Sequence, residues 1–146
     1  MSPHLIERVA VLGAGNGGKA TAADLALQGK RVRLYETPSF AEANLSGITD
    51  LQLHCSGDVQ GVAKLEHISS ELDLALNVVN NSYETAVDTI FICTVVQAHS
   101  VIAKMLVPFL MQWPKDKYPL VVLNPGSTGG SLMMAKIWHE MGLVGI

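Results

Sequence analysis

The residues whose types and spacing most clearly suggest chemistry are three glycines near the start of the chain. Gly13, Gly15 and Gly18 form a G-x-G-x-x-G pattern between a short apolar run and an alanine- and leucine-rich segment. In a strand–turn–helix unit, the first glycine allows a tight turn, the second admits a pyrophosphate, and the third lets the helix pack closely. The unpaired N–H groups of the first helical turn favour an anion there. The pattern predicts a dinucleotide-binding loop made of Gly13, Ala14, Gly15, Asn16, Gly17 and Gly18.

An acidic residue stands where such a unit would hold the ribose of an adenosine. Glu36 ends a second predicted strand, 31–36, and follows Gly18 by 18 positions. A carboxylate at this place can accept hydrogen bonds from both ribose hydroxyls, and it repels a 2′-phosphate. No Arg or Lys occurs from Thr37 to Leu53 to offset that repulsion. The sequence therefore predicts NAD as the cofactor in preference to NADP.

The same residues leave two alternatives. Gly13, Gly18 and Lys19 match most of a phosphate-binding P-loop, but that loop next requires a Ser or Thr that holds magnesium. Here the next residue is Ala20, and Thr21 comes one position late. The other alternative is a glycine-rich turn with no ligand. Dinucleotide binding is favoured because the strand, the glycine turn, the helix and the acid are all in register.

Predicted strands and helices alternate along the chain, which is typical of a parallel sheet with helices on both faces. We expect strands at 8–12, 31–36, 88–96 and 118–123, and helices at 16–28, 97–112 and 131–141. Weaker patterns predict helices at 39–45 and 72–78, a helical turn at 83–87 and a small hairpin at 50–65 that decorates the main sheet. Val144 is expected to begin a further strand. The predicted fold is α/β, a Rossmann-type doubly wound sheet, with residues 1–146 forming one dinucleotide-binding domain.

Ligands of doubly wound sheets bind at the carboxyl ends of the strands, where the strand order reverses. Besides the glycine loop and Glu36, we expect Thr94 and Val95 to line the nicotinamide ribose and Asn124 to approach the nicotinamide. His99 is the one histidine near those ends. It could transfer protons, although a local hydrogen bond at the start of a helix is the favoured interpretation. No residue is assigned a catalytic role, and no histidine spacing is typical of a metal site.

Composition excludes several classes of protein. The net charge of −3 and the lack of a basic patch argue against nucleic acid as a partner. No apolar run approaches the ~20 residues that span a membrane, and the start of the chain lacks a signal pattern, so the expected location is cytoplasmic. Cys55 and Cys93 form no C-x-x-C motif, and Cys93 is interpreted as a small buried hydrophobe.

Three segments together resemble the nucleotide-binding domain of the opine dehydrogenases, the octopine/nopaline dehydrogenase family. They are Val-Leu-Gly-Ala-Gly-Asn-Gly-Gly at 11–18, Ala-Ala-Asp-Leu-Ala-Leu-Gln-Gly at 22–29 and Leu-Asn-Pro-Gly-Ser-Thr-Gly-Gly at 123–130. The resemblance implies hydride transfer from NADH or NADPH to an imine, which forms from an amino acid and a 2-oxo acid. It also implies a helical catalytic domain beyond residue 146, so that this chain alone would be inactive. The chain could form a homodimer, and neither nucleic acid nor a membrane is an expected partner.

Two features depart from that family, and the sequence also fits other functions. Gln97 stands where the family often has a proline, and the stretch 65–88 is longer than usual. The cofactor domain of a ketopantoate-reductase-like or glycerol-3-phosphate-dehydrogenase-like enzyme is one alternative, and a non-catalytic NAD-binding module is another. The loop 124–130 favours the opine dehydrogenases. An apolar stripe on the last helix predicts either core or an interface with a second domain; its members are Met133, Met134, Ile137, Trp138 and Met141.

Overall fold

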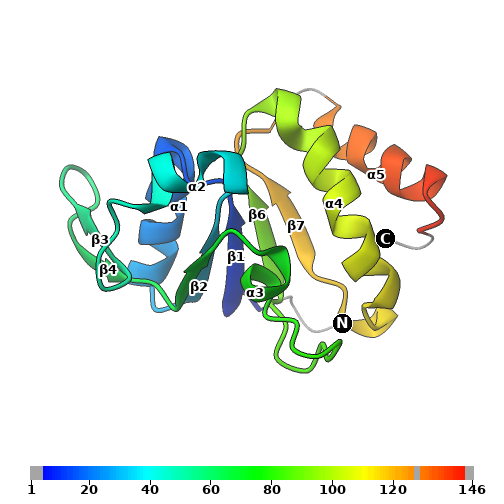
Figure 1. The fold of residues 1–146 in the computed structure, drawn as a ribbon, viewed down its shortest axis with the longest axis horizontal. Coiled ribbons are helices and arrows are strands. Elements are labelled where there is room, and N and C mark those ends of the chain that lie inside the picture. The colour runs from blue at the N-terminus through cyan, green and yellow to red at the C-terminus, as the bar shows by residue number, and fades with distance from the viewer. Residues whose placement is uncertain (1–4, 127–128, 144–146) are drawn as a thin grey trace.

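A parallel five-stranded sheet forms the centre of the computed structural model, which describes residues 5–126 and 129–143. The strand order is β5-β2-β1-β6-β7, and every pairing within this sheet is parallel (Figure 1). The predicted α/β doubly wound fold is therefore confirmed. The predicted strand start at Val144 and the loop residues Ser127 and Thr128 lie outside the described residues. The strands are β1 (Arg8–Leu12), β2 (Arg31–Tyr35), β5 (His67–Ser69), β6 (Thr89–Ile92) and β7 (Leu120–Leu123).

Helices cover both faces of the sheet. One face carries α1 (Asn16–Leu27), and the other carries α3 (Leu72–Leu76), α4 (His99–Gln112) and α5 (Gly130–Glu140). A further helix, α2 (Pro38–Leu45), follows β2 at the carboxyl end of the sheet, close to the start of α4 (Figure 1). The chain leaves β1 through α1 to one side and later returns to β6 on the other side. The strand order thus reverses between β1 and β6, which is where a doubly wound sheet opens its crevice.

Side chains of the central strands alternate between two hydrophobic layers, as the two-residue period of a strand requires. Val9 and Val11 pack towards α1, whereas Ala10 and Leu12 pack towards α3, α4 and α5. All four are fully buried. Because both faces are covered, these strands are continuous apolar runs rather than alternating polar and apolar sequences.

The apolar stripe of the last helix belongs mainly to the core. Met134 and Trp138 are buried against α4, and the Trp138 indole Nε1 donates a hydrogen bond of 2.8 Å to the Ala103 carbonyl oxygen. Met133 and Ile137 are half-buried beside them. Leu132 is 75% exposed and was not part of the predicted stripe.

The predicted hairpin forms, but it does not extend the main sheet. Its strands, β3 (Gln52–Cys55) and β4 (Gly61–Lys64), make a separate antiparallel two-stranded sheet. The prediction that the hairpin lies on the main sheet was therefore wrong. Leu53 and Ala63 are buried in the layer that contains α1. The hairpin thus covers the outer side of α1 (Figure 1).

Other predicted elements needed correction where local signals were short. The strand predicted at 88–96 ends at Ile92, and the helix predicted from 97 begins at His99 after a 3₁₀ turn, Val96–Ala98. The helix predicted at 72–78 ends at Leu76, because Asn77 adopts a left-handed conformation with φ of 56°. Within 83–87, Glu84 and Thr85 form a turn, and no residue is helical. The three-residue strand β5 was not predicted, since it is too short to show a period of its own.

Candidate functional site

The glycine loop has the geometry that the spacing predicts. Gly13 has a φ of +110°, and a Cβ there would lie 2.9 Å from the backbone of Cys93. A Cβ on Gly18 would lie 1.7 Å from the carbonyl oxygen of Gly13, so α1 packs directly on the loop. A Cβ on Gly15 would meet nothing within 4 Å, and Gly15 has an extended backbone, with φ of −70° and ψ of −172°. Gly13 and Gly18 are thus required by packing, whereas Gly15 leaves open space beside the first turn of the helix.

The Glu36 side chain points at the glycine loop rather than into solvent. It is 6% exposed, and its Oε2 atom accepts hydrogen bonds from the Ala14 backbone N–H, at 2.8 Å, and from Asn44 Nδ2, at 2.9 Å. Its Oε1 atom accepts the Thr37 backbone N–H at 2.9 Å and the Thr37 hydroxyl at 3.4 Å. The carboxylate therefore ties the loop after β1 to α2. Its negative charge also raises the pKa of Tyr35, although burial of that phenol is the larger cause.

A pocket of about 340 Å³ lies beside the loop, at the carboxyl ends of β1, β2 and β6. Gly13, Gly15, Glu36, Thr94 and Val95, all predicted site residues, line it. Sequence reasoning missed much of its apolar wall, which comes from side chains on two helices. The spacing of three and four among Ala98, Val101 and Ile102 could have shown the part of the wall at α4. The members of the wall are Phe40 on α2, Val101 and Ile102 on α4, and Ala98 just before α4.

Two buried polar side chains near this pocket lack hydrogen-bond partners. The Thr94 hydroxyl is buried and unpaired, and Thr94 itself lines the pocket. His99 is fully buried, and neither ring nitrogen makes a hydrogen bond. The favoured sequence interpretation, a local hydrogen bond at the start of a helix, was therefore wrong. Buried polar groups are nearly always paired, so this pair of exceptions marks the carboxyl end of the sheet as unusual.

Asn124, a predicted site residue, does not line the pocket beside the glycine loop. It follows β7, and its side-chain Nδ2 donates to the Thr21 hydroxyl at 3.1 Å. That hydroxyl in turn donates to the Gly17 carbonyl oxygen at 2.9 Å. Burial raises the pKa of the Cys93 thiol, and a hydrogen bond with Thr21 works in the opposite direction. Thr21 therefore connects the glycine loop with the ends of β6 and β7, a role that the sequence did not reveal.

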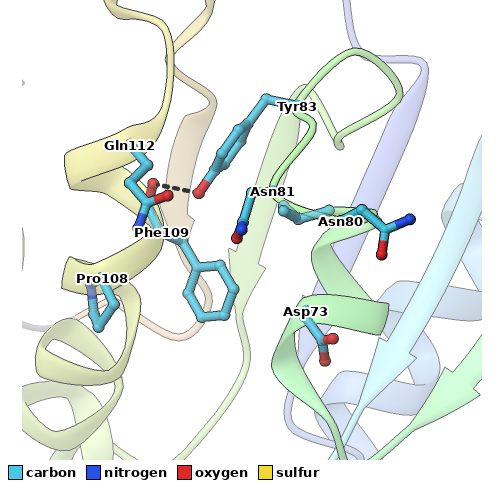
Figure 2. Close-up of a pocket in the computed structure, with 8 residues that line it drawn as sticks. Asp73, Asn80, Asn81, Tyr83, Pro108, Phe109 and Gln112 are labelled. Atoms are coloured by element: carbon cyan, nitrogen blue, oxygen red, sulfur yellow. Dashed lines mark hydrogen bonds between the residues drawn. The ribbon is translucent and has the colours of Figure 1, made fainter.

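Another surface hollow is separate from this site. It has a volume of about 390 Å³ and lies between α3, the loop at 78–83 and the second half of α4 (Figure 2). The Tyr83 hydroxyl donates to the Phe109 carbonyl oxygen at 2.9 Å along one side of it. None of the predicted site residues lines this hollow. Its size alone does not make it the better candidate site.

Within 5–126 and 129–143, no group of three or more His, Cys, Asp or Glu side chains is arranged to hold a metal ion. In the same ranges, no helix has both the length and the apolar character needed to cross a membrane. Lys19 lines a pocket between α1 and the hairpin.

Comparison with known proteins gives one informative similarity. No family model matches the chain. The chain is 31% identical over 133 residues to an opine dehydrogenase of Arthrobacter sp. (strain 1C). The match covers 91% of this chain but 33% of that enzyme, so the chain spans about one third of the length of its curated relative. This similarity, which includes nearly the whole chain, confirms the resemblance of its sequence to the opine dehydrogenases.

Proposed function

We propose that this chain is the NAD-binding domain of an opine-dehydrogenase-like oxidoreductase. In the whole enzyme, hydride would pass from the bound nicotinamide to an imine formed from an amino acid and a 2-oxo acid. The observation that carries the proposal is the pocket at the carboxyl end of β1, β2 and β6, which combines the glycine loop, a buried acid and an apolar wall. The similarity to one third of an opine dehydrogenase supports the same assignment.

Each part of the pocket suits one part of a dinucleotide. The pyrophosphate would lie against Gly15 and the first N–H groups of α1, where no side chain intervenes. The adenine would lie in the apolar part, between Phe40 and Val101. The adenosine ribose would hydrogen-bond to Glu36. The Thr37 hydroxyl makes the longest of the four contacts to that carboxylate, and it is the donor that a ribose hydroxyl would replace.

The role of Gly15 provides a direct test. A Gly15→Val side chain would enter open space and an allowed backbone region, so the variant should fold normally. It should nevertheless lose NADH binding, because the added atoms occupy the place of the pyrophosphate. Isothermal titration calorimetry with NADH would measure the loss, and thermal unfolding would check the fold.

Gly47→Ala is the matched control. Gly47 also has open space around it, and it does not line the pocket. Its NADH affinity should equal that of the unmodified chain. NADH binding that survives in Gly15→Val, or that is absent from the unmodified chain, would contradict the proposal.

The preference for NAD over NADP is a second consequence of the proposal. Two unit charges about 4 Å apart interact by about 4 kcal/mol at an effective dielectric constant of about 20. Because about 1.4 kcal/mol corresponds to tenfold in affinity, Glu36→Ala should lower the NADPH-to-NADH ratio of dissociation constants by at least about tenfold. Titration of both cofactors would measure this ratio.

Asn44→Ala is the control for that ratio. It removes a donor to Glu36 but leaves the negative charge, so the preference for NADH should remain. An equal loss of both cofactors in Glu36→Ala would show that the carboxylate holds the loop without selecting the sugar. We also propose that the chain alone does not oxidise NADH with an amino acid and pyruvate, because no acid/base pair is assigned within it.

A further inference from the structure

Three arginines gather at the amino end of the sheet, opposite the proposed cofactor pocket. Arg8 and Arg31 are paired in register on the neighbouring strands β1 and β2. Arg33 follows two residues later on β2, so its side chain leaves the same face of the sheet as that of Arg31. Like charges in such positions repel one another unless a counter-charge is present.

One carboxylate partly compensates this cluster. Glu66 Oε2 accepts from Arg33 Nη1 at 2.8 Å, and Glu66 Oε1 accepts from Arg31 Nε at 3.1 Å. Arg33 also donates through Nε to the Leu74 carbonyl oxygen at 2.8 Å, and its side chain is 12% exposed. The Arg31 side chain is 67% exposed. Two of the three positive groups therefore share a single partner carboxylate.

The guanidinium of Arg8 takes no part in these two ion pairs. Among the residues that the structure describes, it makes no ion pair within 4 Å. The Asp88 carboxylate accepts the backbone N–H groups of Glu7, at 3.1 Å, and Arg8, at 2.9 Å. Arg8 also lines a neighbouring pocket together with Asp88, Glu84 and Asp116. Arg8 as a whole is half-buried.

The side chains of these arginines line a pocket of about 140 Å³, together with Glu66, Asn77 and Thr85. We propose that this pocket binds a phosphate group, either free or at the end of a larger molecule. The chain as a whole carries a net charge of −3, so a net positive lining is a local feature and not a general property of its surface.

Size and chemistry both favour this ligand. At about 140 Å³, the pocket has room for a phosphate group together with bound water. Guanidinium groups present planar pairs of N–H donors that match phosphate oxygens. Arg31 uses only its Nε towards Glu66, so its two terminal amino groups remain to bind an anion beside Arg8. Glu66 and the phosphate would then share the three arginines.

The test is calorimetric titration of the chain with inorganic phosphate, with chloride added to keep the ionic strength constant. We expect saturable binding to the unmodified chain. Arg8→Gln and Arg31→Gln should each weaken it by about tenfold or more, since each removes charge-assisted hydrogen bonds. Lys30→Gln is the matched control: it removes the same charge next to Arg31 but does not line the pocket. Its affinity should not change.

Phosphate also stabilises proteins generally by exclusion from their surface, so thermal stabilisation alone would not demonstrate binding at this pocket.

Phenyl phosphate distinguishes the two sources of the ligand. Binding of both compounds means that a phosphate ester can enter, and binding of inorganic phosphate alone restricts the site to the free ion. The proposal is overturned if neither compound binds, if acetate binds as well as phosphate, or if Lys30→Gln weakens binding as much as Arg31→Gln. NADH titration of the same variants keeps this result separate from the proposed function.

Discussion

At the scale of single residues, Glu36 and His99 are both buried and polar, but they differ in their hydrogen bonds. Glu36 accepts four hydrogen bonds, from Ala14, Asn44 and Thr37. His99, buried more completely, has no partner at either ring nitrogen. An unpaired buried polar group costs about 1–3 kcal/mol relative to a paired one. Proteins tolerate such costs chiefly at functional positions.

Replacing His99 by an apolar residue of similar size should therefore stabilise the fold. His99→Leu removes two unpaired nitrogens from the core and should raise the free energy of unfolding by about 1–3 kcal/mol. Urea denaturation would show this as a higher midpoint at an unchanged slope.

His99→Gln serves as the comparison, because it keeps polar atoms at the same buried place. It should not show the gain that His99→Leu shows. If His99→Leu instead destabilises the chain more than His99→Gln does, the imidazole has a partner in solution that the structure does not contain.

At the scale of elements, the unit formed by β1, the glycine loop and α1 is held by contact between backbones. Gly18, in the first turn of α1, faces the Gly13 carbonyl group with no room for a side chain. The dinucleotide fingerprint in general accepts alanine at its third position. In this chain the approach is too close for that exchange.

Gly18→Ala should therefore destabilise the chain, because the Cβ would lie 1.7 Å from the carbonyl oxygen of Gly13 and 2.7 Å from its carbon. Overpacking of this kind typically costs about 1–3 kcal/mol. Gly17→Ala, one residue earlier, meets nothing within 4 Å and should be neutral or stabilising by up to about 1 kcal/mol. Chemical denaturation of both variants would measure the contrast, and equal stabilities would show that the loop can move away from α1.

The success of the sequence-based predictions followed the strength of local signals. β1, α1 and β2 were placed within one residue, because apolar runs, glycines and a terminal acid define them locally. β5 was missed, since its three residues pair with β2 residues 34 positions earlier and have no pattern of their own. The hairpin was recognised but its partner was not, because its contact with α1 depends on tertiary packing.

The candidate site divides in the same way. Gly13, Gly15, Glu36, Thr94 and Val95 could be assigned to one place because parallel strands end at a common edge. Asn44 and Phe40 could not, because their position depends on how α2 docks after β2. The bond between Asn44 and Glu36 is therefore a product of tertiary structure, and it decides how many acceptor sites the carboxylate has left.

At the scale of the whole molecule, the arginine cluster should make stability depend on pH. Partial burial acts to raise the pKa of Glu66, but the hydrogen bond and charge of Arg33, and then the charge of Arg31, outweigh it and hold the pKa below its ordinary 4.5. A carboxyl group with a lowered pKa in the folded state contributes stability above its unfolded pKa. That contribution is lost as the pH falls through the folded pKa.

We therefore expect the difference in unfolding free energy between the unmodified chain and Glu66→Gln to shrink as the pH falls from about 6 to about 3. Urea denaturation at several pH values would measure it. Glu140→Gln is the control, because Glu140 is 62% exposed and lies 3.8 Å from Lys136 in a surface pair. A difference that stays constant with pH would mean that the Glu66 pairs do not form in solution.

Both tryptophans of the chain, Trp113 and Trp138, lie in the layer that α4 and α5 form against the sheet. The opposite layer, around α1 and the hairpin, contains neither. Indole fluorescence therefore reports melting of one layer, whereas far-ultraviolet circular dichroism reports the helices of both. Coincident curves from the two probes would mean that the shared strands make the layers unfold together, and separated curves would resolve the order in which they come apart.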